Sequence, residues 1–251
     1  MTDHVEHNRR YWDGQAADYA TWAPRAWEQA EVTWGIWNVP DAELQMLPED
    51  MTGMRAIELG CGTAYMSAYM ARRGADVVGI DVSPNQLATA ERLRDEHGLD
   101  IDLRLGNAEE LPFSDEAFDF ALSEYGAAIW CDPDRWIPEA WRVLRPGGQL
   151  VFLGNAPLAM VCSPVDGSVP VVEELCAPYF GMRRWDFPGD EGISFCLTME
   201  DWFALFRRVG FVVEDYREPR PKDASPGLKY YVDAAWASRW PSEQIFKLRK
   251  P

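Results

Sequence analysis

The stretch Glu58-Leu59-Gly60-Cys61-Gly62-Thr63 decides how this sequence of 251 residues is expected to fold. Residues 54–59 are apolar enough for a buried strand, and residues 64–73 have the period of a helix. A glycine turn between a strand and a helix lets the backbone approach a ligand at the positive end of the helix. The stretch therefore predicts a nucleotide-like ligand, although two glycines alone would also fit a close helix–strand contact.

The surrounding region, residues 54–153, alternates short apolar runs with helix-period segments. This alternation predicts repeated βαβ units and a parallel sheet. Ser83 and Pro84 are typical of a helix start, and Gly74 and Gly98 of helix ends. Arg145-Pro146-Gly147-Gly148 is predicted as a turn. The expected strands are residues 54–59, 76–80, 101–105, 118–122 and 149–153, and the expected helices are residues 64–73, 84–96 and 133–144.

The flanking segments are less regular. The five tryptophans of the N-terminal 50 residues include helical spacings (27 to 34 and 34 to 37), which predict aromatic-faced helices. Those indoles fit a substrate pocket and plain packing equally well. We expect a single domain over residues 1–251, divided into an N-terminal helical cap (1–50), a cofactor-binding core (54–154), a substrate-side insertion acting as a lid (155–197), and a C-terminal helix, capped by Thr198, with strands at 211–216 and 242–249 (198–251).

The composition excludes several classes of protein. The formal net charge is −17, which disfavours a nucleic-acid partner. The five cysteines are scattered, without the spacing of a zinc site or a disulfide framework, so no metal is expected. No run of apolar residues is long enough to span a bilayer, and Met1-Thr2-Asp3-His4 does not begin a leader. We expect a cytoplasmic protein; a homo-oligomer stays open.

Asp81 and Tyr65 narrow the choice of cofactor. Asp81 follows Gly60 by about twenty residues, where a carboxylate at a strand tip can accept hydrogen bonds from ribose hydroxyls. A dinucleotide site would carry a third glycine where Tyr65 stands. The pattern thus favours a nucleoside ligand without a pyrophosphate and disfavours a nicotinamide oxidoreductase.

Four ordered motifs extend the argument to a family: Ala-Ile-Glu-Leu-Gly-Cys-Gly-Thr (56–63), Val-Val-Gly-Ile-Asp-Val-Ser (77–83), Asn-Ala-Glu-Glu-Leu-Pro-Phe (107–113) and Arg-Val-Leu-Arg-Pro-Gly-Gly-Gln-Leu (142–150). Together they resemble the class I S-adenosylmethionine-dependent methyltransferases, in particular the branch of ubiquinone and menaquinone biosynthesis. The resemblance covers residues 54–153, with a looser match through Lys250. It implies an α/β, Rossmann-like three-layer sandwich with a mostly parallel seven-stranded sheet and an antiparallel last strand.

The resemblance also implies roles for individual residues. Glu58, Gly60, Cys61 and Gly62 would border the methionine half of S-adenosylmethionine, Asp81 the ribose and Val82 the adenine. The family has aspartate where this chain has Asn107, which can still hydrogen-bond an adenine edge. Glu58 could instead act as a buried strap. The full predicted cofactor set is Tyr11, Glu58, Gly60, Cys61, Gly62, Thr63, Asp81, Val82, Gln86, Asn107, Ala108, Glu109, Ser123 and Glu124.

Catalysis needs little machinery in such a site. Methyl transfer is an in-line displacement at a sulfonium, so alignment and exclusion of water matter most. Residues 123–125 are expected to face the cleft after the fourth strand of the core. Relatives often carry a histidine in this segment and this chain has none. Glu124 and Tyr11 are the predicted catalytic residues, with His7 and Tyr125 as weaker candidate bases; aromatic walls at Tyr11, Tyr19 and Trp130 could favour the sulfonium.

The function expected from the sequence is methyl transfer from S-adenosylmethionine to a small, partly apolar molecule, leaving S-adenosylhomocysteine. The N-terminal helices and the insertion would enclose the acceptor. A catalytically idle adenosylmethionine-binding or regulatory protein is the alternative, and a nicotinamide oxidoreductase is less favoured. The sequence does not choose between O-, N- and C-methylation.

Overall fold

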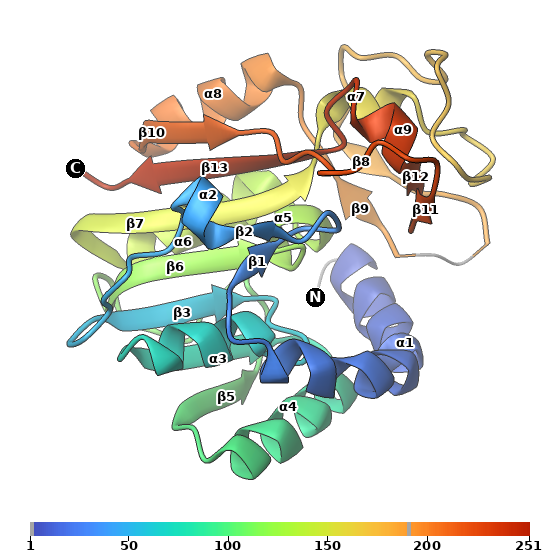
Figure 1. The fold of residues 1–251 in the computed structure, drawn as a ribbon. Coiled ribbons are helices and arrows are strands. Elements are labelled where there is room, and N and C mark those ends of the chain that lie inside the picture. The colour runs from blue at the N-terminus through green and yellow to red at the C-terminus, as the bar shows by residue number, and fades with distance from the viewer. Residues whose placement is uncertain (1–2, 190–191) are drawn as a thin grey trace.

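The computed structural model describes residues 3–189 and 192–251 and is built on one seven-stranded sheet (Figure 1). The strand order is β10-β13-β7-β6-β3-β4-β5. The five strands from β3 to β7 run parallel, and β13 pairs antiparallel with both β7 and β10. This confirms the predicted sheet. Its strands are β3 (Arg55–Leu59), β4 (Asp76–Asp81), β5 (Ile101–Leu105), β6 (Phe118–Glu124), β7 (Leu144–Asn155), β10 (Val212–Arg217) and β13 (Glu243–Arg249).

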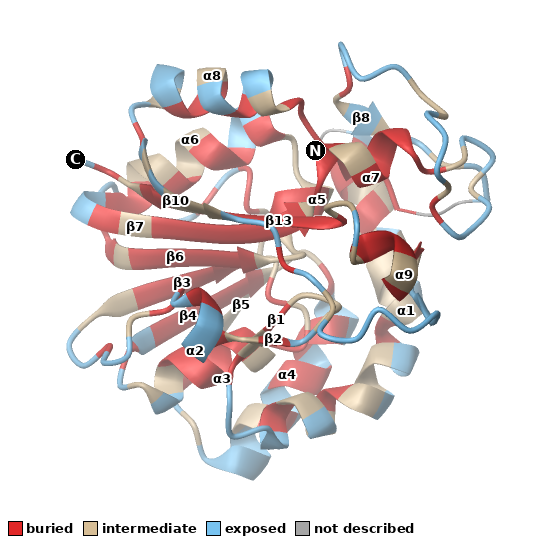
Figure 2. Cartoon of the chain, turned by 45° about the horizontal axis from the view of Figure 1, so that its top comes forward, coloured by how far each residue is buried: buried red, intermediate tan, exposed pale blue. Residues whose placement is uncertain are grey.

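Helices cover both faces of the sheet because neighbouring strand residues point to opposite sides. In β3, Ala56 packs with residues of α3 (Tyr65–Arg72) and α4 (Pro84–His97). Ile57 packs instead with α6 (Pro133–Val143) and α8 (Met199–Val209). Most of the buried residues in Figure 2 accordingly form two cores on the two faces of the sheet, and a third, smaller cluster lies around α7 and α9.

The predicted helix ends are confirmed. Ser83 accepts a hydrogen bond from the Gln86 amide at the start of α4, and Gly98 ends that helix in the left-handed region at φ +61°. Thr198 accepts from the Asp201 amide at the start of α8. These caps fix where each helix meets its strand.

The predicted turn at Arg145-Pro146-Gly147-Gly148 is wrong, because β7 begins at Leu144 and includes it. The pairing between β6 and β7 shifts there: Phe118 faces Leu144, whereas Phe120 faces Gln149. The Gly147 and Gly148 backbone instead bonds Lys250, the residue after β13. The Pro-Gly-Gly signal marks an irregularity inside a strand.

The N-terminal segment also differs from expectation. One helix, α1 (Asp3–Glu28), carries Trp27 at its end, but Trp34 lies in the strand β1 (Thr33–Trp34) and Trp37 in the turn that follows. The helix predicted across residues 27–37 is therefore wrong. β1 pairs with β2 (Val39–Pro40), and α2 (Asp41–Leu44) follows at once.

The insertion and the C-terminal region carry short elements that lie together at one end of the sheet (Figure 1). Apart from residues 190 and 191, which are outside the described part, residues 155–197 form mostly irregular chain around α7 and one small hairpin. The short elements here are α7 (Pro157–Val161), β8 (Arg184–Trp185), β9 (Ser194–Phe195), β11 (Leu228–Lys229), β12 (Val232–Asp233) and α9 (Ala234–Ala237); α5 (Ala127–Trp130) follows β6. In the described part of the chain, no helix is both long and apolar enough to cross a membrane.

Asp41 connects the hairpin formed by β1 and β2 to the core. Its buried Oδ1 accepts from the Trp34 indole at 2.8 Å and from the Met46 amide at 3.0 Å, and its Oδ2 lies 3.1 Å from the Arg73 guanidinium. We expect Asp41→Asn to lower the free energy of unfolding by about 1–2 kcal/mol, because the amide keeps Oδ1 and loses the ion pair. Urea unfolding measures this loss.

The matched control for Asp41→Asn is Glu43→Gln in the same short helix. Glu43 and its partner Lys222 are both exposed, so removing that pair is expected to cost less than about 0.5 kcal/mol. Equal costs for the two variants would contradict the role given to Asp41.

Candidate active site

The glycine turn lies at the carboxyl end of β3. The amides of Gly60 and Cys61 both donate to the Ile80 carbonyl, at 2.9 and 3.0 Å. Gly60 has φ +75°, and a Cβ there would lie 2.7 Å from the Cα of Gly126 and 2.7 Å from the amide nitrogen of Ala127. Only glycine fits, because the loop after β6 presses directly on the turn.

Asp81 ends β4 beside this turn. Its Oδ2 accepts from the Gly62 amide and its Oδ1 from the Ser83 amide, both at 2.8 Å. Burial raises the pKa of the Asp81 carboxyl, against the lowering effect of these amide donors. The carboxylate is thus held by two backbone groups at the wall of a cavity.

That cavity, of about 540 Å³, lies along the carboxyl edge of the sheet, where α/β sheets place their ligands. The structure brings twelve of the fourteen predicted cofactor residues to its wall: Tyr11, Glu58, Gly60, Cys61, Gly62, Thr63, Asp81, Val82, Gln86, Asn107, Ala108 and Glu124. Glu109 and Ser123 are not among the lining residues.

Ser123 corrects the expectation that all of residues 123–125 face the cleft. Its side chain is fully buried, donates to the Leu59 carbonyl at 2.8 Å and accepts from the Ala128 amide at 3.1 Å. It joins two loops behind the wall. Glu124 and Tyr125 do line the cavity.

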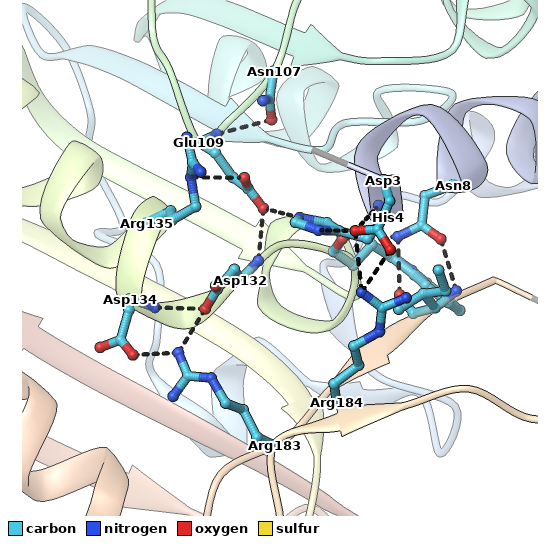
Figure 3. A network of polar contacts seen from close by, with 12 residues as sticks. Asp3, His4, Asn8, Asn107, Glu109, Asp132, Asp134, Arg135, Arg183 and Arg184 are labelled. Atoms are coloured by element: carbon cyan, nitrogen blue, oxygen red, sulfur yellow. Dashed lines mark hydrogen bonds and ion pairs between the residues drawn. The ribbon is translucent and has the colours of Figure 1, made fainter. Parts of the chain in front are cut away.

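Glu109 instead fastens the N-terminal helix (Figure 3). Its Oε1 lies 2.5 Å from Nε2 of His4 and accepts from the Asp132 amide at 2.7 Å, while its Oε2 lies 3.1 Å from Arg135. Asn8 adds hydrogen bonds to the Trp130 carbonyl and to the backbone of Ile193. These contacts hold α1 over the cavity.

Two side chains at the wall have unused polar atoms. Both amide atoms of Gln86 and the hydroxyl of Thr63 are buried without a hydrogen-bond partner among the described residues. Buried polar groups are normally paired, so such atoms indicate a ligand that supplies the partner. A ligand with hydroxyl, amino and carboxylate groups fits this donor and acceptor set.

Glu58 is buried below the turn. Its Oε2 accepts from the Ser67 amide at 2.7 Å and from the Ser67 hydroxyl at 2.5 Å. These bonds strap the first turn of α3 to β3, the alternative role foreseen for this residue. Burial nevertheless raises its pKa to about 8, because the two Ser67 donors only partly offset the loss of hydration.

Aromatic rings line the other half of the cavity in a continuous series. The series runs in the order Tyr65, Trp22, Tyr19, Trp12 and Trp130. The distances between the centroids of successive rings are 6.1, 4.9, 5.3 and 5.1 Å. Tyr11 lies 6.0 Å from Trp130. Two of the N-terminal tryptophans, Trp12 and Trp22, thus line the cavity, whereas Trp27 and Trp34 are buried in the core.

Glu124 lies at the Tyr65 end of this series. Its Oε1 accepts from the Gly35 amide at 3.0 Å, and its Oε2 accepts from the Tyr65 hydroxyl. Burial raises the pKa of the carboxyl. A raised pKa makes the carboxylate a stronger base, so the geometry suits a proton acceptor.

Several residues at this end were missed from the sequence. In the sequence, Tyr65 served only as evidence against a dinucleotide site, because it stands where a third glycine would be. Tyr230 and Tyr231 fall in a segment without a periodic pattern. All three line the cavity. Glu243 begins β13 and accepts from the Tyr125 hydroxyl at 2.5 Å and the Ile36 amide at 2.8 Å. An acid at the start of an apolar strand was the one signal that could have revealed Glu243.

The described residues include no cluster suited to a metal ion.

Comparison with known proteins gives consistent relatives. A family model described as "Methyltransferase domain" matches residues 57–152. The ubiquinone biosynthesis O-methyltransferase of Cereibacter sphaeroides is 30% identical over 163 residues, 65% of this chain and 62% of the relative. The demethylmenaquinone methyltransferase of Thermus thermophilus is 37% identical over 105 residues, 41% of this chain and 48% of the relative.

Solved structures agree in fold. The S-adenosylmethionine-dependent methyltransferase of Mesorhizobium loti has a TM-score of 0.68 and 25% identity, and the match covers 83% of this chain and 95% of that one. The chain spans 62% of the length of the first curated relative, and the matching region includes the glycine turn, Asp81 and Glu124. Residues 57–152 thus match a methyltransferase domain, and the chain shares the fold of an S-adenosylmethionine-dependent methyltransferase.

Proposed function

We propose that this protein transfers the methyl group of S-adenosylmethionine to a small, partly apolar acceptor. One observation carries the proposal: the glycine turn, Asp81 and the unpaired Gln86 amide line the same cavity as the aromatic series and Glu124. A single continuous space thus offers polar partners for a nucleoside at one end and an apolar chamber at the other. That is what a two-substrate transfer requires.

The residues at the polar end are proposed to hold the cofactor. Asp81 would accept hydrogen bonds from the ribose hydroxyls, Asn107 and the Gln86 amide would contact the adenine end, and Glu58 would favour the ammonium group of the methionine half. The bound cofactor supplies a methyl group on a positively charged sulfur. The chain's own task is to align the acceptor in line with that methyl and to exclude water.

The acceptor is proposed to occupy the aromatic chamber. Its walls are Trp12, Tyr19, Trp22, Tyr65 and Trp130, and α1 closes over it through His4 and Asn8. Flat apolar walls suit a partly apolar molecule of modest size. The relative from Cereibacter sphaeroides is named for ubiquinone biosynthesis and the one from Thermus thermophilus for demethylmenaquinone, which supports a small-molecule acceptor.

The test combines binding with turnover. Isothermal titration calorimetry should show one S-adenosylhomocysteine site, and Asp81→Ala should weaken it at least tenfold, because two ribose hydrogen bonds are lost. Mass spectrometry should then detect S-adenosylhomocysteine formed from S-adenosylmethionine with a panel of phenols, amines and quinols. Binding without turnover of any acceptor would favour the idle adenosylmethionine-binding protein instead.

Glu58 gives a separate prediction about protons. With a pKa of about 8, its carboxyl is mostly protonated at pH 7. An ammonium group placed beside it stabilises the charged form, so S-adenosylhomocysteine binding is expected to release close to one proton per site. Titrations at pH 7 in buffers of different ionisation enthalpy measure this number.

The control for the proton release is Glu58→Gln, which keeps the oxygen that accepts from Ser67 and cannot titrate. This variant should bind without releasing the proton. Release of the same number of protons by the variant would place the titrating group elsewhere.

A further inference from the structure

The carboxylates around the cavity have no cationic partner. Glu58, Asp81, Glu124 and Glu243 form no ion pair with any lysine, arginine or histidine of the described residues 3–189 and 192–251. Of the basic side chains that line the cavity, Arg25 and Lys229 are both exposed. Burial raises the pKa of all four carboxyls and no nearby cation offsets that effect, so a cation placed beside one of them would favour its charged form.

The proposed cofactor would be a partner for only some of these carboxyls. In the proposed function Glu58 is the partner of its ammonium group and Asp81 the partner of its ribose. Glu243 is fully buried behind the wall and is not a lining residue. Glu124 is therefore the carboxylate left facing the acceptor chamber, and its donors, Tyr65 and the Gly35 amide, are neutral.

The rings next to Glu124 strengthen this point. Tyr65 donates to it, and Trp22 and Tyr19 continue the series. Burial raises the pKa of Tyr19 and Tyr230, and the negative charge of Glu124 adds to the rise in both, which places these phenols near Glu124. Aromatic faces attract cations, and a carboxylate set among aromatic rings is the arrangement that binds ammonium groups. A phenolate or a carboxylate acceptor would be repelled here.

From this arrangement we infer that the methyl acceptor is an amine, bound as its ammonium form against Glu124 within the cage of Tyr19, Trp22, Tyr65 and Tyr230. This inference rests on the proposed function and adds the acceptor's chemical class. The ammonium gives one proton to the Glu124 carboxylate, and the freed nitrogen lone pair forms the new N–C bond. The C–S bond breaks, its electron pair stays on sulfur, and the positive charge passes to the methylated nitrogen.

The first experiment lets one molecule choose between two acceptor atoms. Tyramine carries an aliphatic amine and a phenol, and mass spectrometry separates N-methyltyramine from the O-methyl product. We expect the N-methyl product in at least tenfold excess. Predominant O-methylation would overturn the amine inference and leave the methyltransferase function standing.

The second experiment measures recognition without turnover. In the complex with S-adenosylhomocysteine, 2-phenylethylamine is expected to bind at least tenfold more tightly than 2-phenylethanol, its uncharged analogue of similar size. Equal affinities would overturn the inference even if tyramine were not methylated. Failure of S-adenosylhomocysteine itself to bind would count against the proposed function, which separates the two failures.

Variants assign the preference to Glu124. Glu124→Gln keeps one acceptor oxygen, which serves either the Gly35 amide or the Tyr65 hydroxyl, and should reduce the amine-over-alcohol ratio to about one. The matched control is Glu243→Gln, the same change at a buried acid outside the cavity wall, which should keep the ratio above ten. Loss of the ratio in both variants, or in neither, would contradict the role given to Glu124, and the wild-type measurements stand even if Glu124→Gln does not fold.

Discussion

Gly60→Ala is expected to lower the free energy of unfolding by about 3–4 kcal/mol and to weaken S-adenosylhomocysteine binding at least tenfold. The backbone at Gly60 is left-handed, which costs a residue with a Cβ about 1–2 kcal/mol. The added carbon would also lie 2.7 Å from the backbone of the loop after β6, so the turn or that loop must move. Urea unfolding and calorimetric titration measure the two effects.

Gly62→Ala is the matched control for this prediction. Gly62 is also left-handed, at φ +52°, but a Cβ there meets no atom within 4 Å. The control therefore carries the backbone cost alone, about 1–2 kcal/mol. Equal destabilisation of the two variants would show that the approach of Gly126 to the turn does not matter.

The parts of the fold that could be predicted are those governed by local chemistry. Residues 101–105 form a strand with the predicted bounds, and Ser83 and Thr198 cap their helices as expected, because cap hydrogen bonds and apolar periodicity act within a few residues. Arg145-Pro146-Gly147-Gly148 was misread because the same residues that favour a turn also permit a bulge. Only the neighbouring strands decide between the two.

The N-terminal tryptophans show a second limit. Trp27 and Trp34 are seven residues apart, a helical spacing, yet the chain leaves the helix after Glu28 and forms a hairpin. The reason is tertiary: Trp27 donates to the Thr63 carbonyl, and Trp34 donates to Asp41. Contacts over such distances leave no periodic trace in the sequence.

The candidate site divides in the same way. Its polar end comes from strand ends within residues 58–108, so sequence motifs locate it. Its other end, where we propose that the acceptor binds, combines Gly35, Tyr65, Glu124 and Tyr230, residues far apart in the chain that the fold alone brings together. Motifs shared by a family describe the common ligand, and the acceptor chamber is built from segments outside them.

Glu243 leads to the second large effect, a loss of stability as the pH rises. Burial raises the pKa of its carboxyl to about 8, whereas in the unfolded chain a glutamate titrates near pH 4.3. Between these values the folded protein keeps a proton that the unfolded chain releases. The free energy of unfolding therefore falls as the pH rises from about 4.3 to about 8, by on the order of 4–5 kcal/mol from this residue.

Glu243→Gln should remove that contribution. The amide is neutral at every pH and keeps an oxygen to accept from Tyr125 and the Ile36 amide. Relative to the wild type, the variant is expected to gain several kcal/mol at pH 8 and to gain little at pH 4, as measured by urea unfolding across this range. Glu58 also makes the free energy of unfolding fall as the pH rises, and it does so equally in the wild type and the variant. The difference between the two proteins therefore isolates the contribution of Glu243.

Glu139→Gln is the control of opposite sign. The Arg142 guanidinium holds the pKa of Glu139 below its usual range, so its charged form stabilises the folded state at neutral pH and that stability is lost as the pH falls. At pH 8 this variant should be less stable than the wild type, by less than about 1 kcal/mol because the pair is partly exposed. If Glu243→Gln also lost stability at pH 8, the wild-type Glu243 carboxylate would have to be charged and favourably bound in the folded protein. Burial would then not raise the pKa of the acids around the cavity in the way argued above.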